Sequence, residues 1–172
     1  LTYRFAFHNI KVAVKEKILQ EDFEHIYSKV HYEDLDNLRK QFETEKGEKG
    51  TWYEDTVIQA YKTFEETKDP EKIEFFIDKR YFEKVLEISK NLELDLVEEY
   101  FRSMIDFINI RTFIRCKRQE QDISVLKEAL IQGGYIDIDD ISTYFYKEIQ
   151  DLVNAYKNTK IGKSLFLGLK GY

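Results

Sequence analysis

Apolar residues recur every three or four positions over most of this chain, which is the spacing of amphipathic α-helices. The clearest stretch runs from about residue 94 to residue 118. Its apolar stripe is predicted to face a core and comprises Val97, Phe101, Met104, Ile105 and Ile108. A second, polar stripe follows the same helix and comprises Arg102, Asp106 and Asn109. The pattern therefore predicts one long helix over 94–118.

Local signals predict where several helices begin and end. Asp69-Pro70-Glu71 has an N-capping residue, a proline suited to the first helical position and an acid in the first turn. Asp78 is predicted to start another helix, whose core-facing residues are Tyr81, Val85 and Ile88. The polar stretch 44–51, with two glycines, is predicted to be a loop.

Two further signals lie near the C-terminal end. Gly133-Gly134 predicts a helix stop, because glycine enters the left-handed C-cap conformation cheaply. Asp137, with Asp140 three residues later, resembles a capping box. The helix that it opens is predicted to bury Ile138, Ile141, Phe145, Ile149, Leu152 and Tyr156.

Composition favours an all-α fold. The 172 residues include only seven glycines and one proline, whereas β-rich folds need turn residues every eight to twelve positions. Charged residues make up 35% of the chain and aromatic residues 15%, so long helices can be solvated on one side and packed on the other. We expect an internally repeated helical bundle.

Charge and cysteine usage narrow the function. The net charge of −6 argues against nucleic acid as the main partner, because phosphate binding needs a basic face. No apolar run approaches the ~18 residues that span a bilayer. Cys116 is the only cysteine, so an intrachain disulfide is impossible. Because the chain starts at Leu1 rather than Met, we expect it to be a fragment of a longer protein.

The sequence repeats itself. Phe7-His8-Asn9-Ile10-Lys11 matches Phe107-Ile108-Asn109-Ile110-Arg111 at an offset of 100 residues, which also pairs Lys15 with Arg115 and Lys17 with Lys117. Looser matches pair Tyr32, Leu35, Leu38 and Phe42 with Tyr135, Ile138, Ile141 and Phe145, and Ala60-Tyr61-Lys62 with Ala155-Tyr156-Lys157. We expect two copies of a helical unit, in 1–100 and 101–172, the second incomplete.

The repeated element carries a family resemblance. Asp106-Phe107-Ile108-Asn109-Ile110-Arg111-Thr112, ending in Arg115-Cys116-Lys117, resembles the signature of the C-type rotor subunits of bacterial and archaeal V/A-type ATPases, which are related to the d-type subunits of eukaryotic V-ATPases. Phe7 to Lys11 resembles the same signature, with Ala6 in the place of Asp106. The stretches 78–82 and 133–137 also resemble the family, so the resemblance covers essentially the whole chain in order.

This resemblance implies a rotor adaptor. Members of the family are built from three helical repeats around a pseudo-threefold axis, of which this chain would lack the first. The adaptor sits between the central stalk and the membrane proteolipid ring and has neither a nucleotide site nor a proton path. The resemblance thus implies no catalytic residue, no cofactor and a place on the cytoplasmic face of the membrane, held there through protein partners.

Seven residues are candidates for a structural or interface role. They are Asn9, Lys11, Lys15, Asp106, Asn109, Arg111 and Arg115. We interpret Asn109 and Asp106 as structural, because buried polar groups in mid-helix usually bond to neighbouring backbone. The basic residues have two open interpretations, as solvated or salt-bridged edges or as contacts to a partner protein. Between residues 102 and 118 five basic residues accompany one acid, Asp106.

Other functions have weaker support. The three histidines lack metal-ligand spacing and no second cysteine completes a zinc site, so no metal is expected. No nucleophile or paired-carboxylate arrangement has catalytic spacing. A generic helical-repeat scaffold for cytosolic partners is the main alternative to the rotor adaptor. A helical enzyme would require carboxylates or histidines that converge on one pocket.

Overall fold

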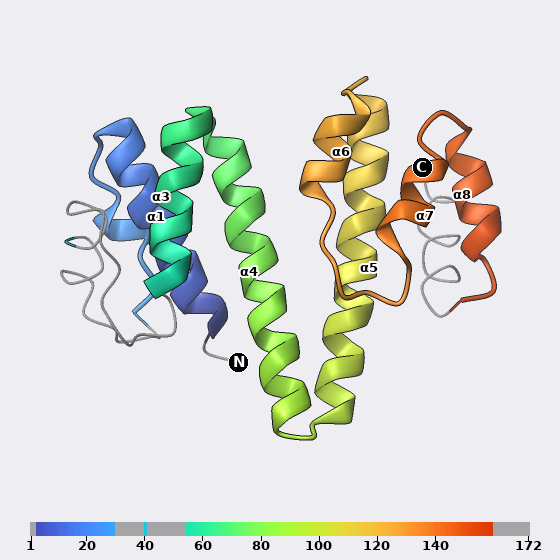
Figure 1. Cartoon of the computed structure of the whole chain (residues 1–172), viewed down its shortest axis with the longest axis horizontal. Coiled ribbons are helices and arrows are strands. Elements are labelled where there is room, and N and C mark those ends of the chain that lie inside the picture. Colours follow the sequence, from blue (N-terminus) through green and yellow to red (C-terminus); the bar gives the residue numbers. More distant parts are fainter. Residues whose placement is uncertain (1–2, 30–39, 41–53, 160–172) are drawn as a thin grey trace. The chain divides into compact units, whose positions relative to one another are not determined.

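The computed structural model describes residues 3–29, 40 and 54–159, and within these ranges all regular secondary structure is helical (Figure 1). The predicted all-α fold is confirmed. The chain divides into two compact units, unit 1 (Leu1–Tyr81) and unit 2 (Phe82–Tyr172). The predicted loop at 44–51 and the predicted match of Tyr32, Leu35, Leu38 and Phe42 lie outside the described residues.

In the described residues of unit 1, three long helices pack around one core. It contains α1 (Tyr3–Leu19), the short 3-10 helix η1 (Glu24–Ile26), α3 (Glu54–Thr67) and the first half of α4 (Pro70–Asn91). The buried apolar residues come from all three long helices and the connection after α1. They are Phe7, Ile10, Val12, Ala13, Val14, Tyr27, Val57, Ala60, Ile73 and Ile77.

Helix α4 begins as predicted and ends later than predicted. Pro70 is its first residue, and the Glu71 amide donates to Asp69 Oδ1 at 2.9 Å. The prediction that Asp78 starts a new helix is wrong, because α4 continues without interruption to Asn91. No glycine or proline follows Pro70 within the helix, and Asp78 is instead held by Lys11, far away in the sequence.

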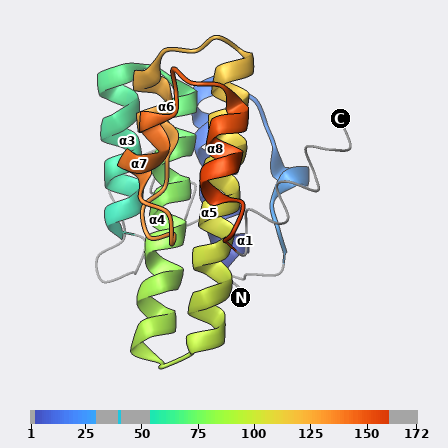
Figure 2. The same ribbon diagram turned by 90° about the vertical axis from the view of Figure 1, so that its right-hand side faces the viewer.

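Unit 2 contains the second half of α4, then α5 (Asp95–Arg118), α6 (Ile123–Ala129), α7 (Ile138–Thr143) and α8 (Ile149–Tyr156). Figure 2 shows a tight turn that joins the end of α4 to the start of α5, so that the chain reverses its direction between them. A core cluster lies between α5 and the shorter helices. It comprises Ile110, Phe113, Cys116, Leu126, Leu130, Ile136, Ile141, Phe145 and Leu152.

Helix α5 confirms the predicted helix over 94–118, and its predicted apolar stripe is buried only in part. Phe101 and Ile105 are buried, whereas Val97 is 37% exposed. The polar residues Asp106 and Asn109 are completely buried. Both are buried because the irregular segment 130–136 packs against the polar stripe.

The Gly133-Gly134 pair does not end a helix. Helix α6 stops at Ala129, and Leu130 is already extended with φ −67° and ψ 139°. Gly133 has a φ of 99°, a conformation that favours glycine. A Cβ on Gly134 would overlap a carboxylate oxygen of Asp106 and lie 3.0 Å from its Cγ. The two glycines thus let the backbone approach α5 closely.

The helix predicted after Asp137 is two helices. Asp137 caps α7 by accepting from the amides of Asp139 and Asp140, which confirms the predicted N-terminus. α7 ends at Thr143, and α8 restarts at a capping box formed by Glu148 and Asp151. Between them, Lys117 Nζ donates to the carbonyl oxygens of Phe145 at 2.5 Å and Lys147 at 2.6 Å. Lys117 thereby satisfies backbone groups that the interruption leaves without helical partners.

Among the described residues, four helix ends place a non-glycine residue in the left-handed region, namely Gln20, Lys68, Glu93 and Glu120, with φ between 52° and 55°. At the end of α5, the Gln121 amide donates to the Cys116 carbonyl at 3.0 Å and the Glu120 amide to the Lys117 carbonyl at 3.2 Å. This is the Schellman pattern, with glutamate where glycine is the usual residue. None of the helices in the described ranges is long and apolar enough to cross a membrane.

Candidate functional site

Asn109 joins α5 to the segment that follows α6. Its side-chain Nδ2 donates to the Ile131 carbonyl at 2.8 Å, and its Oδ1 accepts from the Ile131 amide at 2.8 Å. Both bonds are buried, so Asn109 supplies the hydrogen-bond partners of the Ile131 peptide group, which lies outside any helix. One carboxamide therefore fixes the whole peptide of Ile131 to the middle of a long helix.

Asp106 holds the same segment one turn earlier on α5. Its carboxylate accepts from the amides of Tyr135 at 3.1 Å and Ile136 at 3.0 Å. Burial raises the pKa of the Asp106 carboxyl above its usual range, although the two amide bonds and the nearby Arg102 act in the opposite direction. Asp106 and Asn109 therefore anchor both ends of the segment 130–136.

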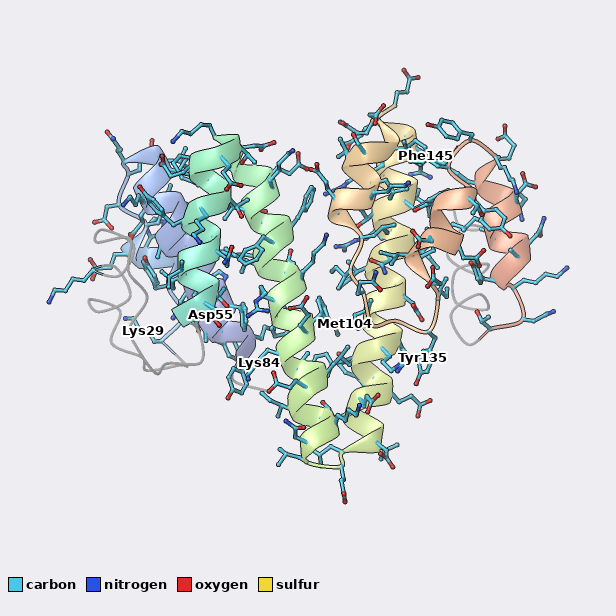
Figure 3. The ribbon with its side chains drawn as sticks, viewed as in Figure 1. Lys29, Asp55, Lys84, Met104, Tyr135 and Phe145 are labelled. Carbon is cyan, nitrogen blue, oxygen red and sulfur yellow. The ribbon has the colours of Figure 1, made fainter. Side chains whose placement is uncertain are left out.

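Arg102 extends this attachment by a further turn. Its guanidinium donates to the Gly134 carbonyl at 3.1 Å and lies 4.6 Å from the centre of the Tyr135 ring, on the segment beside α5 where Figure 3 labels Tyr135. Arg102 also forms an ion pair with Glu98 at 3.5 Å. We call Arg102, Asp106 and Asn109 together the α5 clamp. These are the three residues of the predicted polar stripe.

Unit 1 contains the same carboxamide contact. Asn9 is 3% exposed, its Nδ2 donates to the Ser28 carbonyl at 3.1 Å, and its Oδ1 accepts from the Ser28 amide at 2.8 Å. Its backbone target lies 19 residues downstream, whereas that of Asn109 lies 22 residues downstream. The intervening connection is thus three residues shorter in unit 1, where it contains the three-residue η1 in place of the seven-residue α6.

The connection after each long helix also matches in detail. Asp22 Oδ1 accepts from the Glu24 amide at 2.8 Å, and Asp122 Oδ1 accepts from the Ser124 amide at 2.8 Å. The left-handed Gln20 and Glu120 lie two residues before them, with φ 55° and 53°. The offset of 100 residues seen in the sequence therefore relates local geometry as well as residue type in this part of the chain.

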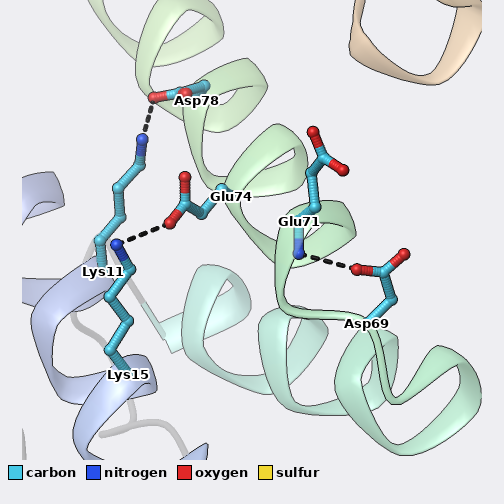
Figure 4. A network of polar contacts seen from close by, with 6 residues as sticks. All are labelled: Lys11, Lys15, Asp69, Glu71, Glu74 and Asp78. Carbon is cyan, nitrogen blue, oxygen red and sulfur yellow. Dashed lines mark hydrogen bonds and ion pairs between the residues drawn. The ribbon is translucent and has the colours of Figure 1, made fainter. Parts of the chain in front are cut away.

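Lys11 and Lys15 connect α1 to α4 inside unit 1. Lys11 Nζ lies 2.5 Å from Asp78 Oδ1, and Lys15 Nζ lies 2.8 Å from Glu74 Oε1, as Figure 4 shows. All four side chains are partly exposed, so each pair contributes little by itself, about 0–1 kcal/mol. Their main effect is to fix how α4 lies along α1.

Arg111 and Arg115 are placed differently from their counterparts. Both are exposed on α5, and neither forms an ion pair within the described ranges. The structure therefore brings Asp106 and Asn109 together in one clamp, pairs Lys11 and Lys15 with α4, and leaves the two arginines on the surface. The sequence analysis did not identify Glu74 and Asp78 as the partners of Lys15 and Lys11. The available signal was that these two acids, like the two lysines, lie four residues apart and so share one face of a helix.

A hollow of about 550 Å³ adjoins the α5 clamp. Asp106, Asp137, Asp140 and Tyr156 line it, and the Tyr156 hydroxyl donates to Asp140. Burial, and after it this hydrogen bond, raise the pKa of the Tyr156 hydroxyl. Among the residues that the structure describes, no three His, Cys, Asp or Glu side chains are grouped so that they could hold a metal ion.

Comparison with known families identifies the class of protein. The Asn-Ile-basic element, on which the sequence resembles V/A-type ATPase subunits, lies on a long helix in both units. In each unit its asparagine binds a backbone segment further along the chain. The family of the ATP synthase (C/AC39) subunit matches residues 1–171, and the chain belongs to this family. The family consists of rotor-associated subunits of V/A-type ATPases. Searches of curated proteins and of solved structures gave no match.

Proposed function

We propose that this chain belongs to a non-catalytic rotor subunit that couples the central stalk of a V/A-type ATPase to the membrane proteolipid ring during proton or sodium transport. The observation that carries the proposal is the family match over 1–171. Within the complex the rotor protein transmits rotation between protein partners and binds no nucleotide. Its place is on the cytoplasmic face of the membrane, where protein contacts hold it.

The internal contacts support a mechanical role. Rotation is transmitted only if the rotor protein deforms little under load, and buried hydrogen bonds in close-packed cores resist deformation. The carboxamide contacts of Asn9 and Asn109, with the two amide bonds of Asp106, attach irregular segments firmly to long helices. Such segments would otherwise be the most compliant parts of the two units.

Coupling is tested by reconstitution of the parent complex in vesicles, with and without the complete rotor protein. We expect ATP hydrolysis by the catalytic head to persist without this protein, while ion transport per ATP hydrolysed falls to background. The purified rotor protein by itself should show no ATP hydrolysis. Unchanged transport per ATP on omission, with head and ring still assembled, would refute the proposal.

The partner is tested separately by capture of central-stalk proteins on the immobilised complete rotor protein. Binding is expected for the wild type and for Asn154→Ala, which alters an exposed residue of α8. If the folded wild type captures no stalk protein, the proposed place in the rotor is contradicted. That result would favour the alternative of a helical scaffold for other cytosolic proteins.

A further inference from the structure

The segment 138–156 has the sequence pattern of one helix and the structure of two. Its apolar residues keep helical spacing throughout, and it contains neither glycine nor proline. α7 nevertheless ends at Thr143 and α8 begins at Ile149, with Glu148 extended before it at φ −68° and ψ 148°. We call residues 144–148 the α7–α8 hinge. Because the sequence supplies no helix breaker there, we attribute the interruption to tertiary contacts.

Lys117 of α5 makes such a contact with the hinge. Its Nζ donates to the carbonyl oxygens of Phe145 at 2.5 Å and Lys147 at 2.6 Å. In a continuous helix these two carbonyls would accept from the backbone amides of Ile149 and Asp151, four residues later. One ammonium group therefore takes the place of two amide donors at the point where the helix is interrupted.

The hinge folds α8 back on α7. The Tyr156 hydroxyl donates to the Asp140 carboxylate, and the rings of Tyr144 and Tyr156 lie 6.3 Å apart. Asp140 and Tyr156 are 16 residues apart, so a continuous helix would place their Cα atoms about 24 Å from each other. The folded-back form also buries Leu152 and Val153. The two forms of this segment thus differ by a distance that can be measured.

We propose that Lys117 is the latch of a two-state helical element. While Lys117 holds the α7–α8 hinge, the element is the folded-back pair of helices, and without this contact it becomes one continuous helix over 138–156. In the continuous form the hinge carbonyls regain amide donors, and the apolar stripes of α7 and α8 lie along one face. Pairing of Lys117 with a carboxylate of a bound protein would release the latch. The inference rests on contacts within unit 2 and does not depend on the proposed rotor function.

The distance between two spin labels in the whole chain tests the latch. Asp139→Cys and Ala155→Cys place the labels at exposed positions of α7 and α8, and Cys116→Ala in every variant removes the native thiol. Wild-type Lys117 should give a short distance, whereas a continuous helix places the two labelled Cα atoms about 24 Å apart. Lys117→Met should raise the ratio of the long to the short form about tenfold or more, because two charge-assisted hydrogen bonds are lost.

A proline at position 149 locks the hinge and identifies the released form. Ile149 is the first residue of α8, where proline is tolerated, and Glu148 already has the extended conformation that favours a following proline. In a continuous helix the same proline would be an interior residue and would disrupt it. Lys117→Met/Ile149→Pro should therefore return to the short distance. The matched control is Lys127→Met, the same change at an exposed position of α6, which should stay short.

Glu148→Ala weakens the folded-back form from the other side of the hinge and leaves Lys117 in place. The Glu148 side chain accepts from the Asp151 amide in the capping box of α8, and alanine favours a continuous helix. The ratio of long to short form should rise in this variant, and Ile149→Pro should cancel the rise. If Lys117→Met does not fold, Glu148→Ala decides the proposal, which is overturned when the ratio does not rise.

Each outcome decides the proposal. A long distance in Lys117→Met that disappears with Ile149→Pro, and that Lys127→Met does not show, supports the latch. The wild-type distance in folded Lys117→Met overturns it. A long distance that persists with Ile149→Pro does so too, because the released form is then not a continuous helix. Circular dichroism and urea unfolding verify that each variant is folded.

Discussion

Removal of the Asn109 side chain should loosen unit 2 more than any comparable change on its surface. Asn109→Ala leaves the amide and the carbonyl of Ile131 buried without their partners. A buried polar group without a hydrogen bond costs about 1–3 kcal/mol, so the two groups together should lower the free energy of unfolding by about 2–6 kcal/mol. The change also leaves a small cavity on α5, which adds to the loss.

The equivalent change in unit 1 should have a smaller effect. The bonds of Asn9 to Ser28 are only partly buried, so water can replace them in part. We expect about 1–2 kcal/mol for Asn9→Ala, for the same pair of lost hydrogen bonds. The order of the two effects is the sharper expectation, because it depends on burial alone and not on the absolute magnitudes.

Hydrogen exchange measured residue by residue checks the reasoning, alongside urea unfolding. The Ile131 amide should lose most of its protection in Asn109→Ala, while the Ser28 amide is unaffected. Asn154→Ala, at an exposed position of α8, is the control and should change the free energy of unfolding by less than about 0.5 kcal/mol. The reasoning is refuted if the Ile131 amide keeps its protection in Asn109→Ala and the free energy of unfolding falls by less than in the control. The bonds of Asn109 would then contribute no stability.

Three further predictions concern the same unit. Gly134→Ala should lower the free energy of unfolding by about 1–3 kcal/mol, because the added Cβ would overlap the Asp106 carboxylate. An unchanged free energy of unfolding in urea would contradict this close approach of the backbone to Asp106. Glu120→Gly should raise the free energy of unfolding by about 0.5–1 kcal/mol, because glycine adopts the left-handed backbone conformation of position 120 without strain. Gln119→Gly is the control, because its φ of −92° does not favour glycine, and it should give no gain in urea unfolding. Equal effects of the two changes would refute this explanation. Asp106 has a raised pKa when folded, so its ionisation opposes folding at neutral pH and this penalty disappears as the pH falls through the folded value to the ordinary one. Wild type should therefore gain stability relative to Asp106→Asn as the pH is lowered toward about 4, and a difference constant with pH in paired unfolding series would refute it.

The helices were predictable where their signals are local. Asp69-Pro70-Glu71 and Asp137 supply the first-turn bonds themselves, and the periodicity of 94–118 is long enough to identify α5. Asp78 was predicted to start a helix because the sequence alone does not distinguish an aspartate in mid-helix from one at a helix N-terminus. Its partner, Lys11, lies 67 residues away, and no local pattern shows that pairing.

The α5 clamp was predictable only in part. The sequence identifies a polar stripe on the helix but not the backbone groups that it binds. Asp106 and Asn109 are buried because a backbone segment from far along the chain provides their hydrogen bonds. The Gly133-Gly134 pair contains the missing information, since adjacent glycines permit backbone to approach a helix as well as to end one. The partner contacts of Arg111 and Arg115 stay predictions, because they involve another molecule.

The carboxamide contacts also predict how the two units tolerate substitution. A side chain that bonds to a peptide group does not depend on which residue carries that peptide group. The targets of Asn9 and Asn109 already differ, since one is Ser28 and the other is Ile131. Position 28 should therefore accept many residues other than proline, whereas position 9 should accept almost nothing in place of asparagine. At position 131 the surrounding core adds a demand for an apolar side chain. A saturation library scored for folded protein would thus show asparagine fixed on the helix and wide variation in the segment that it holds.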